Sequence, residues 1–172
     1  MTAARTVRAA DVRPRPWANG GGTTRELAVA DDGAWRVSLA DVDRDGPFST
    51  FAGRQRLLTL VEGPVLDLQV DGDAHVVEPQ RPFAFPGDAI TVASVPEGPV
   101  RVLNVVVDPG VVRPYVTVLE LGRSSTFPLG VDQAAYVVSG ARDGLETGSL
   151  VLGPGEVAGR CTVAVVTLER VS

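Results

Sequence analysis

Apolar and polar residues alternate in short runs along the whole chain, a period-2 pattern that is typical of strands with one buried face. Turn signals such as Asp71-Gly72 and Pro86-Gly87 separate the runs. No long segment repeats at helical period, and short helices are expected only near the N-terminus and around Asp41–Asp45. About ten strands are predicted, which favours an all-β sandwich or barrel over a layered α/β fold. The expected strands are Leu27–Ala30, Trp35–Ala40, Leu57–Val61, Val65–Val70, Ala89–Val92, Val100–Val107, Tyr115–Leu119, Ala135–Val138, Ser149–Leu152 and Thr162–Leu168.

Two stretches of the chain share one pattern: an apolar strand that ends in glycine, a Pro-Gly-acid turn, and a valine-rich strand. The first copy comprises Leu60–Gly63, Phe85–Asp88 and Val102–Val106, and the second comprises Val137–Gly140, Gly153–Glu156 and Val163–Val166. This rhythm is typical of the double-stranded β-helix, or cupin, fold. Two copies predict a bicupin with cupin-like units at residues 1–108 and 109–172, the second being a degenerate repeat. The alternative is an unrelated β-sandwich in which common Pro-Gly turns coincide.

Composition narrows the functional classes. The 172-residue chain has a net charge of -5, which disfavours general binding to nucleic acid because phosphate neutralisation needs a basic surface. The first residues hold no apolar run long enough for a signal peptide, and no segment approaches the length of a membrane span. Cys161 is the single cysteine, so no intramolecular disulfide can form. A cytoplasmic protein without a membrane partner is therefore expected.

Counting alone limits metal and nucleophile chemistry. His75 is the single histidine, so the His and Cys clusters that hold zinc or iron cannot be built, and no metal or other cofactor is expected. A magnesium or calcium site made of carboxylates stays open, although no Asp-x-Asp-x-Asp-Gly spacing supports one. No Gly-x-Ser-x-Gly elbow is present for a serine nucleophile. Cys161 is expected to be a small buried apolar side chain, and His75 to be solvated or hydrogen-bonded.

The segment Asn19–Thr24 contains three successive glycines but lacks the lysine and the spacing of a phosphate-binding loop. Glycines permit positive φ and leave backbone N–H groups open, which suits either a tight turn before a strand or close approach to an anion. On the second strand after this segment, Trp35–Ala40, Arg36 and Ser38 share the face opposite Val37. That polar face lies either in solvent or in the wall of a pocket, and patterning by itself favours solvent.

Five segments in this order resemble the HutD/Ves family: Pro16–Glu26, Trp35–Ala40, Asp45–Phe51, Arg56–Leu60 and Phe85–Asp88. The second half, Val111–Val166, is similar to the family only in its cupin rhythm. The resemblance implies a metal-free bicupin that many bacteria encode beside histidine-utilisation genes. It implies no firmly assigned catalytic activity, and a regulatory role through binding of a pathway metabolite. The chain departs from the family pattern at Ala18, where a basic residue is frequent, and at Leu103, where an acid is.

The leading hypothesis is that a polar pocket in the first unit binds a small carboxylate metabolite, such as urocanate or N-formylglutamate, because the planar arginine fork matches a carboxylate. An alternative is a cofactor-free isomerase or hydrolase with Glu26 as general base and Arg36 as electrostatic stabiliser. A third is a module that binds protein partners, and a homodimer is compatible with the sequence. No catalytic residue is assigned. The predicted ligand-binding residues are Asn19, Gly20, Gly21, Thr24, Glu26, Arg36, Ser38, Arg56 and Asn104.

Overall fold

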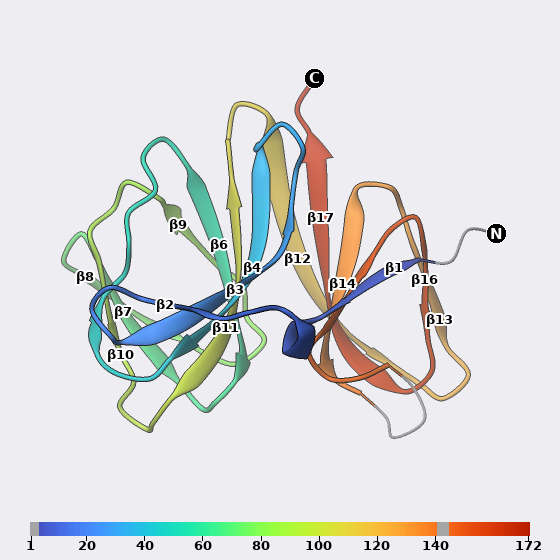
Figure 1. The fold of residues 1–172 in the computed structure, drawn as a ribbon, viewed down its shortest axis with the longest axis horizontal. Coiled ribbons are helices and arrows are strands. Elements are labelled where there is room, and N and C mark those ends of the chain that lie inside the picture. The colour runs from blue at the N-terminus through green and yellow to red at the C-terminus, as the bar shows by residue number, and fades with distance from the viewer. Residues whose placement is uncertain (1–3, 141–144) are drawn as a thin grey trace. The chain divides into compact units, whose positions relative to one another are not determined.

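The computed structural model describes residues 4–140 and 145–172, and nearly all of its regular structure is β (Figure 1). Contacts divide the chain into two compact units. Unit 1 joins the N-terminal segment up to Arg13 with Arg113–Arg170, whereas unit 2 comprises Pro14–Val112 with the last two residues. The expected split at residues 1–108 and 109–172 differs from this division mainly in the N-terminal segment. Its strand β1 (Arg5–Arg8) pairs with β15 (Ser149–Leu152) of unit 1.

Unit 2 contains two antiparallel sheets. The six-stranded sheet has the order β2 (Arg15–Pro16), β3 (Gly22–Val29), β4 (Trp35–Val42), β11 (Val100–Val107), β6 (Gln55–Glu62) and β9 (Phe83–Pro86). The four-stranded sheet has the order β5 (Gly46–Pro47), β10 (Thr91–Ser94), β7 (Leu66–Val70) and β8 (Asp73–Val77). Asp71 and Gly72 both have positive φ, so they form the two-residue hairpin turn that joins β7 to β8.

The core of unit 2 is built by side chains at alternate strand positions. Leu58, Leu60 and Val102 of the six-stranded sheet cluster with Leu66 and Leu68 of the four-stranded sheet, and all five are almost completely buried. We call this side of the six-stranded sheet its inner face. Because successive side chains along a strand alternate between faces, the inner face continues from Leu58 to Arg56 on β6.

Unit 1 contains a five-stranded sheet and a separate pair of short strands. The sheet has the order β1, β15, β14 (Gln133–Ser139), β17 (Cys161–Arg170) and β12 (Val112–Leu121), and the pair is β13 (Thr126–Leu129) with β16 (Gly155–Ala158). The buried cluster between them consists of Leu129, Ala135, Val137, Val151, Val157, Cys161, Val163 and Val165. The expectation that Cys161 is a buried apolar side chain is confirmed, and burial raises the pKa of its thiol.

Every predicted strand overlaps a strand of the structure, and Val100–Val107 and Ser149–Leu152 have the predicted bounds. The N-terminal helix is a single 3-10 turn, η1 (Ala9–Asp11). The short helix expected around Asp41–Asp45 is wrong, because β4 runs on to Val42 and the next two backbone N–H groups, of Asp43 and Arg44, both donate to the Gly21 carbonyl. Within the described ranges, no helix has both the length and the apolar character needed to cross a membrane.

Candidate functional site

Unit 2 contains a pocket of about 270 Å³ at one end of the inner face of its six-stranded sheet. Most of the predicted ligand-binding residues line it, namely Asn19, Thr24, Arg36, Ser38, Arg56 and Asn104. The other lining residues are Trp17, Ala18, Ala40, Pro47, Phe48, Ser49, Phe51, Leu58, Val102 and Val106. Gly20, Gly21 and Glu26 do not line the pocket. The polar face of β4 is therefore a pocket wall, which is the reading that patterning alone disfavoured.

Strand register explains why these residues meet. Val106 on β11 pairs with Arg36 on β4 and with Arg56 on β6, so the three form one row across the sheet. In the next row, Asn104 pairs with Ser38 on one side. Directly opposed residues in antiparallel strands project to the same face, which brings both arginines, the serine and the asparagine to one surface.

Arg56 is buried, with 5% of its surface exposed, although it carries a guanidinium group. The guanidinium carbon lies 5.3, 5.0 and 4.8 Å from the ring centroids of Phe48, Phe51 and Phe85. Nη1 donates a hydrogen bond of 3.1 Å to the Ser49 carbonyl, while Nε is buried without a hydrogen-bond partner. Among the described residues, no carboxylate forms an ion pair with this side chain.

Burial lowers the pKa of Arg56 to about 10, which still leaves the guanidinium charged at neutral pH. Contact with aromatic faces offsets part of the lost hydration, at about 0.5–2 kcal/mol for a cation–π pair. A buried charge is usually paired, because burial of an unpaired charge is expensive. The wall of the pocket therefore carries a positive charge that no carboxylate of the described chain neutralises.

Asn104 adds a second unsatisfied group to the same wall. Its Oδ1 is buried and has no hydrogen-bond partner among the described residues. Ser38, its cross-strand neighbour, is also buried. An amide both donates and accepts, and a hydroxyl does the same, so this row can bind a polar ligand group of either kind.

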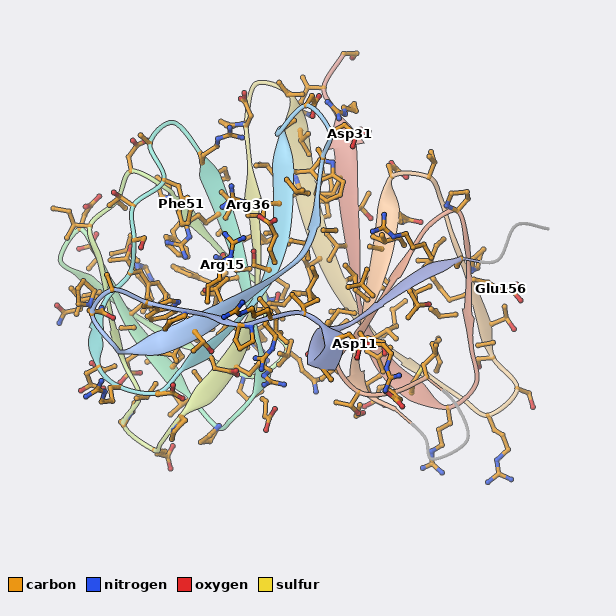
Figure 2. All side chains as sticks on the ribbon, viewed as in Figure 1. Asp11, Arg15, Asp31, Arg36, Phe51 and Glu156 are labelled. Atoms are coloured by element: carbon orange, nitrogen blue, oxygen red, sulfur yellow. The ribbon has the colours of Figure 1, made fainter. Side chains whose placement is uncertain are left out.

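Arg36 lies nearer to solvent than Arg56 does, and it has a partner. Its Nε lies 3.1 Å from Glu26 Oε1 in an ion pair, and the two side chains are 49% and 43% exposed. Figure 2 labels Arg36 together with Phe51, another residue that lines the pocket. Glu26 thus contacts a pocket arginine, although it is not part of the pocket lining.

The glycine-containing loop is a tight turn whose N–H groups are largely used within the protein. Gly20 N donates to the Trp17 carbonyl, and Gly21 N donates to Asn19 Oδ1 over 2.8 Å. Gly20 has φ of +70°, a conformation that favours glycine, and a Cβ on Gly22 would collide with the Asp41 carbonyl oxygen. Glycine is therefore favoured at the first position and required at the second. The arrangement supports the turn interpretation of the loop over the anion-cradle interpretation.

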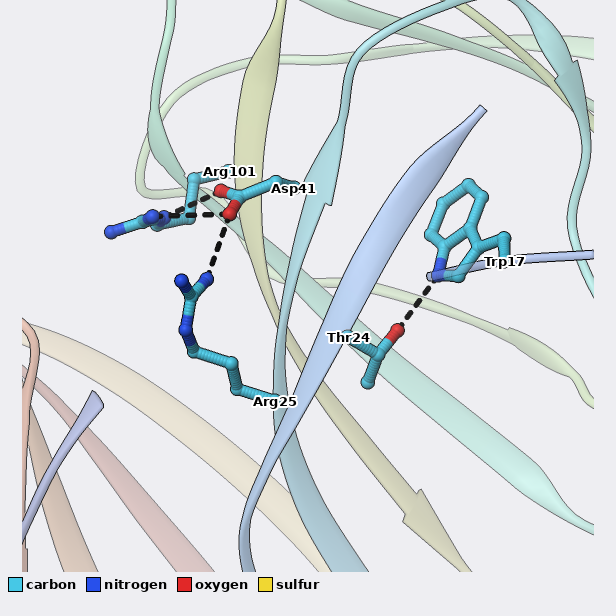
Figure 3. Close-up of polar contacts among 5 residues, drawn as sticks. All are labelled: Trp17, Thr24, Arg25, Asp41 and Arg101. Atoms are coloured by element: carbon cyan, nitrogen blue, oxygen red, sulfur yellow. Dashed lines mark hydrogen bonds and ion pairs between the residues drawn. The ribbon is translucent and has the colours of Figure 1, made fainter. Parts of the chain in front are cut away.

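Asn19 and Thr24, at the two ends of the loop, both line the pocket, as does Trp17 just before the loop. Asn19 Nδ2 donates to the Pro47 carbonyl over 3.3 Å, which connects the loop to the chain around β5. Trp17 Nε1 donates to Thr24 Oγ1 over 2.8 Å (Figure 3), and the Trp17 ring meets the Phe48 ring edge-on at 5.8 Å. The indole is thus held in place as part of the pocket wall.

An ion-pair cluster occupies the opposite face of the same sheet (Figure 3). Asp41 accepts hydrogen bonds from Arg101 Nε at 2.6 Å, Arg101 Nη2 at 3.1 Å and Arg25 Nη1 at 3.0 Å. Burial alone would raise the pKa of the Asp41 carboxyl, but the hydrogen bonds and charges of Arg101 and Arg25 outweigh it and hold the pKa below its ordinary value. Both arginines thus have a carboxylate partner within the described part of the protein, unlike Arg56.

Within residues 4–140 and 145–172, no group of three or more His, Cys, Asp and Glu side chains is placed to hold a metal ion. His75 lies on β8, and its ring centroid is 4.8 Å from that of Phe83.

The sequence-based site did not include the aromatic residues. Trp17, Phe48 and Phe51 all line the pocket, and two of them contact the Arg56 guanidinium. All three lie in segments that carry the family resemblance, Pro16–Glu26 and Asp45–Phe51. Their position in these segments was the sequence signal that could have identified them as site residues.

The HutD family model matches residues 9–156 of this chain. An uncharacterized 21.2 kDa protein in the hutC 3′ region of Pseudomonas putida is 37% identical over 121 residues, 63% of this chain and 60% of that protein. Protein Ves of Citrobacter koseri is 38% identical over 96 residues, 51% of this chain and 50% of that protein. The chain thus matches less than two thirds of the length of these relatives.

Two solved structures resemble this chain over nearly its whole length. HutD from Pseudomonas fluorescens SBW25, in a formate condition, has a TM-score of 0.78 and 28% identity, and the match covers 97% of this chain and 100% of that one. A conserved protein of unknown function from Pseudomonas aeruginosa PAO1 has a TM-score of 0.78 and 30% identity, with coverage of 98% and 100%. The predicted all-β double-stranded β-helix class, in bicupin form, is confirmed. The chain belongs to the HutD family.

Proposed function

We propose that unit 2 binds a small carboxylate metabolite in the pocket described above, in an accessory or regulatory role in histidine utilisation. The observation that carries the proposal is Arg56, a buried cation that lines the pocket and forms no ion pair with a carboxylate of the described chain. A ligand carboxylate would supply the missing negative charge. It would also offer acceptors to the guanidinium, whose Nε has no partner.

The chemistry of the remaining wall supports a ligand with more than one polar group. A carboxylate on an arginine fork forms charge-assisted hydrogen bonds, which are about twice as strong as neutral ones. The Asn104 amide would bind a formyl, amide or imidazole group of the ligand, because it can both donate and accept. The Trp17, Phe48 and Phe51 rings offer flat apolar contact to the rest of the molecule.

The size of the pocket also favours a metabolite over a larger ligand. Its volume of about 270 Å³ lies just under the range of about 300–1,000 Å³ that is usual for sites of drug-sized molecules. Urocanate and N-formylglutamate are carboxylates of histidine breakdown and fit this class. The hutC 3′ region origin of the Pseudomonas putida relative supports that metabolic setting.

Calorimetric titration of the wild-type protein with urocanate, N-formylglutamate and glutamate tests the proposal. The decisive variant is Arg56→Met, which keeps an unbranched side chain inside the aromatic cluster but removes the charge. Loss of a charge-assisted contact of about 2–3 kcal/mol should weaken binding about a hundredfold. The melting temperature should stay equal or rise, because a buried charge without an anionic partner is removed.

Arg81→Met is the matched control, because Arg81 is a highly exposed arginine of the same unit outside the pocket lining. It should bind the ligand as wild type does. Absence of binding of all three compounds by the wild-type protein would exclude the ligand class. Equal affinity of wild type and Arg56→Met would show that the carboxylate is not bound at Arg56.

A further inference from the structure

We propose that Glu26 is an internal competitor of the ligand, a carboxylate that holds Arg36 until a ligand carboxylate takes its place. This inference rests on the proposed function and gives the two pocket arginines different tasks. Arg56 would anchor the ligand, since it has no carboxylate partner among the described residues. Arg36 would respond to the ligand, since its Nε already forms an ion pair with Glu26 Oε1 at 3.1 Å.

Strand register places Glu26 where it can act on the pocket without lining it. Glu26 on β3 pairs directly with Ser38 on β4, and Arg36 stands two residues from Ser38 on the same strand. Glu26 and Arg36 are therefore diagonal neighbours on one face, a separation that two long side chains can bridge. The β-bulge between Glu26 and Ala28 ends the regular register just beyond this point.

The Glu26–Arg36 ion pair reduces the positive charge of the pocket. The pocket lining contains two arginines and no Asp or Glu among the described residues. Glu26 is thus the carboxylate that neutralises one of the two positive charges from outside the lining. Without Glu26, neither the Arg36 nor the Arg56 guanidinium would have a carboxylate partner among the described residues, and a ligand anion would be attracted by both charges.

The hydrogen-bond donors lead to the same conclusion. An arginine binds a carboxylate in bidentate form through two neighbouring N–H groups. Glu26 Oε1 lies 3.1 Å from Nε, which belongs to one of the two edges of the fork. Both side chains are nearly half exposed, so the pair is weak and can exchange partners at little cost. A ligand carboxylate that uses this edge must displace Glu26.

A double-mutant cycle tests the competition. Calorimetry would compare wild type, Glu26→Gln, Arg36→Gln and the double variant, with urocanate and N-formylglutamate as probes. Glu26→Gln keeps the shape of the side chain and removes its charge. We expect it to tighten binding about two- to fivefold in the wild-type background, the range that corresponds to an exposed ion pair. In the Arg36→Gln background the same change should leave the affinity unchanged.

Glu78→Gln is the control, because Glu78 forms a similar exposed pair with Arg81 at 3.3 Å outside the pocket lining, and it should not alter binding. Weaker binding by Glu26→Gln would overturn the inference, because Glu26 would then be a direct ligand contact. An equal gain in both backgrounds would overturn it too, by showing general repulsion that does not act through Arg36. If the wild-type protein binds none of urocanate, N-formylglutamate and glutamate, both proposals fail; if it binds one of them and Glu26→Gln does not change that affinity, only this one fails.

Discussion

The two units of the chain fold from the same kind of strand alternation but have different interiors. In unit 1 the buried cluster around Leu129, Val137 and Val163 is made wholly of apolar side chains among the described residues. In unit 2 the inner face is apolar around Leu60, whereas the rows of Arg56 and Asn104 make it polar and open it to a pocket. The difference is therefore confined to a few inner-face positions.

The contrast between the two interiors distinguishes residues that stabilise the fold from residues that suit ligand binding. A closely packed apolar cluster contributes to stability through burial, and it offers a ligand no polar partners. A polar interior costs stability unless its groups are paired, and Arg56 Nε and Asn104 Oδ1 have no partner in the described chain. Polar groups of this kind are expected at functional sites, where a ligand completes the pairing. We therefore propose unit 2 as the binding element, and we expect the apolar cluster of unit 1 to serve stability.

The largest expected effect comes from a cavity in unit 1. Leu129→Ala removes most of a side chain that is 4% exposed, and it should lower the free energy of unfolding by about 3 kcal/mol. Affinity for the ligand should stay unchanged at a temperature where the variant is folded. Urea denaturation and calorimetric titration measure the two quantities. A large loss of affinity in a fully folded Leu129→Ala variant would break the division between a structural and a binding unit.

A smaller and opposite effect is expected in unit 2. Asn104→Leu replaces a side chain that has an unpartnered buried oxygen by an apolar one of similar shape. Removal of the unsatisfied group should raise stability by about 1 kcal/mol, while binding weakens about tenfold. Melting curves and titration with urocanate check both signs. If Asn104→Leu lowers stability and leaves affinity intact, the asparagine is a structural residue.

The fold could be predicted from sequence wherever strands are long and rich in Val and Leu. Val100–Val107 satisfies this and has its predicted bounds. Short strands that contain Pro or Gly were missed, such as β13 with Pro128 and β16, which begins at Gly155, because these residues are ordinarily signs of turns. The pairing of β1 with β15 joins opposite ends of the chain, and local patterning carries no information on such a contact.

The site could be predicted only in part, for a similar reason. Alternation along one strand places Arg36 and Ser38 on the same face, but the family resemblance, and not patterning, assigned that face to a pocket. The aromatic cluster around Arg56 was not predicted. Phe51, which contacts Arg56, lies outside any strand, so alternation cannot indicate where its side chain points. The pairing of Glu26 with Arg36 depends on the register of two strands, which only the structure supplies.

A second contrast lies within unit 2, between an arginine without a carboxylate partner and arginines that have one. Arg25 and Arg101 both bind Asp41 on the face opposite the pocket. Their hydrogen bonds and charges outweigh the effect of burial and lower the pKa of Asp41. Substitution of Asp41 should therefore change the stability of the protein and the pH dependence of that stability, without changing the affinity for the ligand.

Asp41→Asn is the variant that tests this last and smallest effect. The carboxyl has a lower pKa in the folded state than in the unfolded chain, where it is about 3.9. Its stabilising contribution is then fully present above the unfolded value and is lost as the pH falls through the folded value. At pH 7 the variant should be less stable by about 1 kcal/mol, because Asn offers the two arginines no charge. Below about pH 4 the difference between variant and wild type should shrink as the wild-type carboxyl takes up its proton. Urea denaturation at pH 7 and pH 3 measures it, and a difference that persists undiminished at pH 3 would mean that shape and not charge makes Asp41 stabilising.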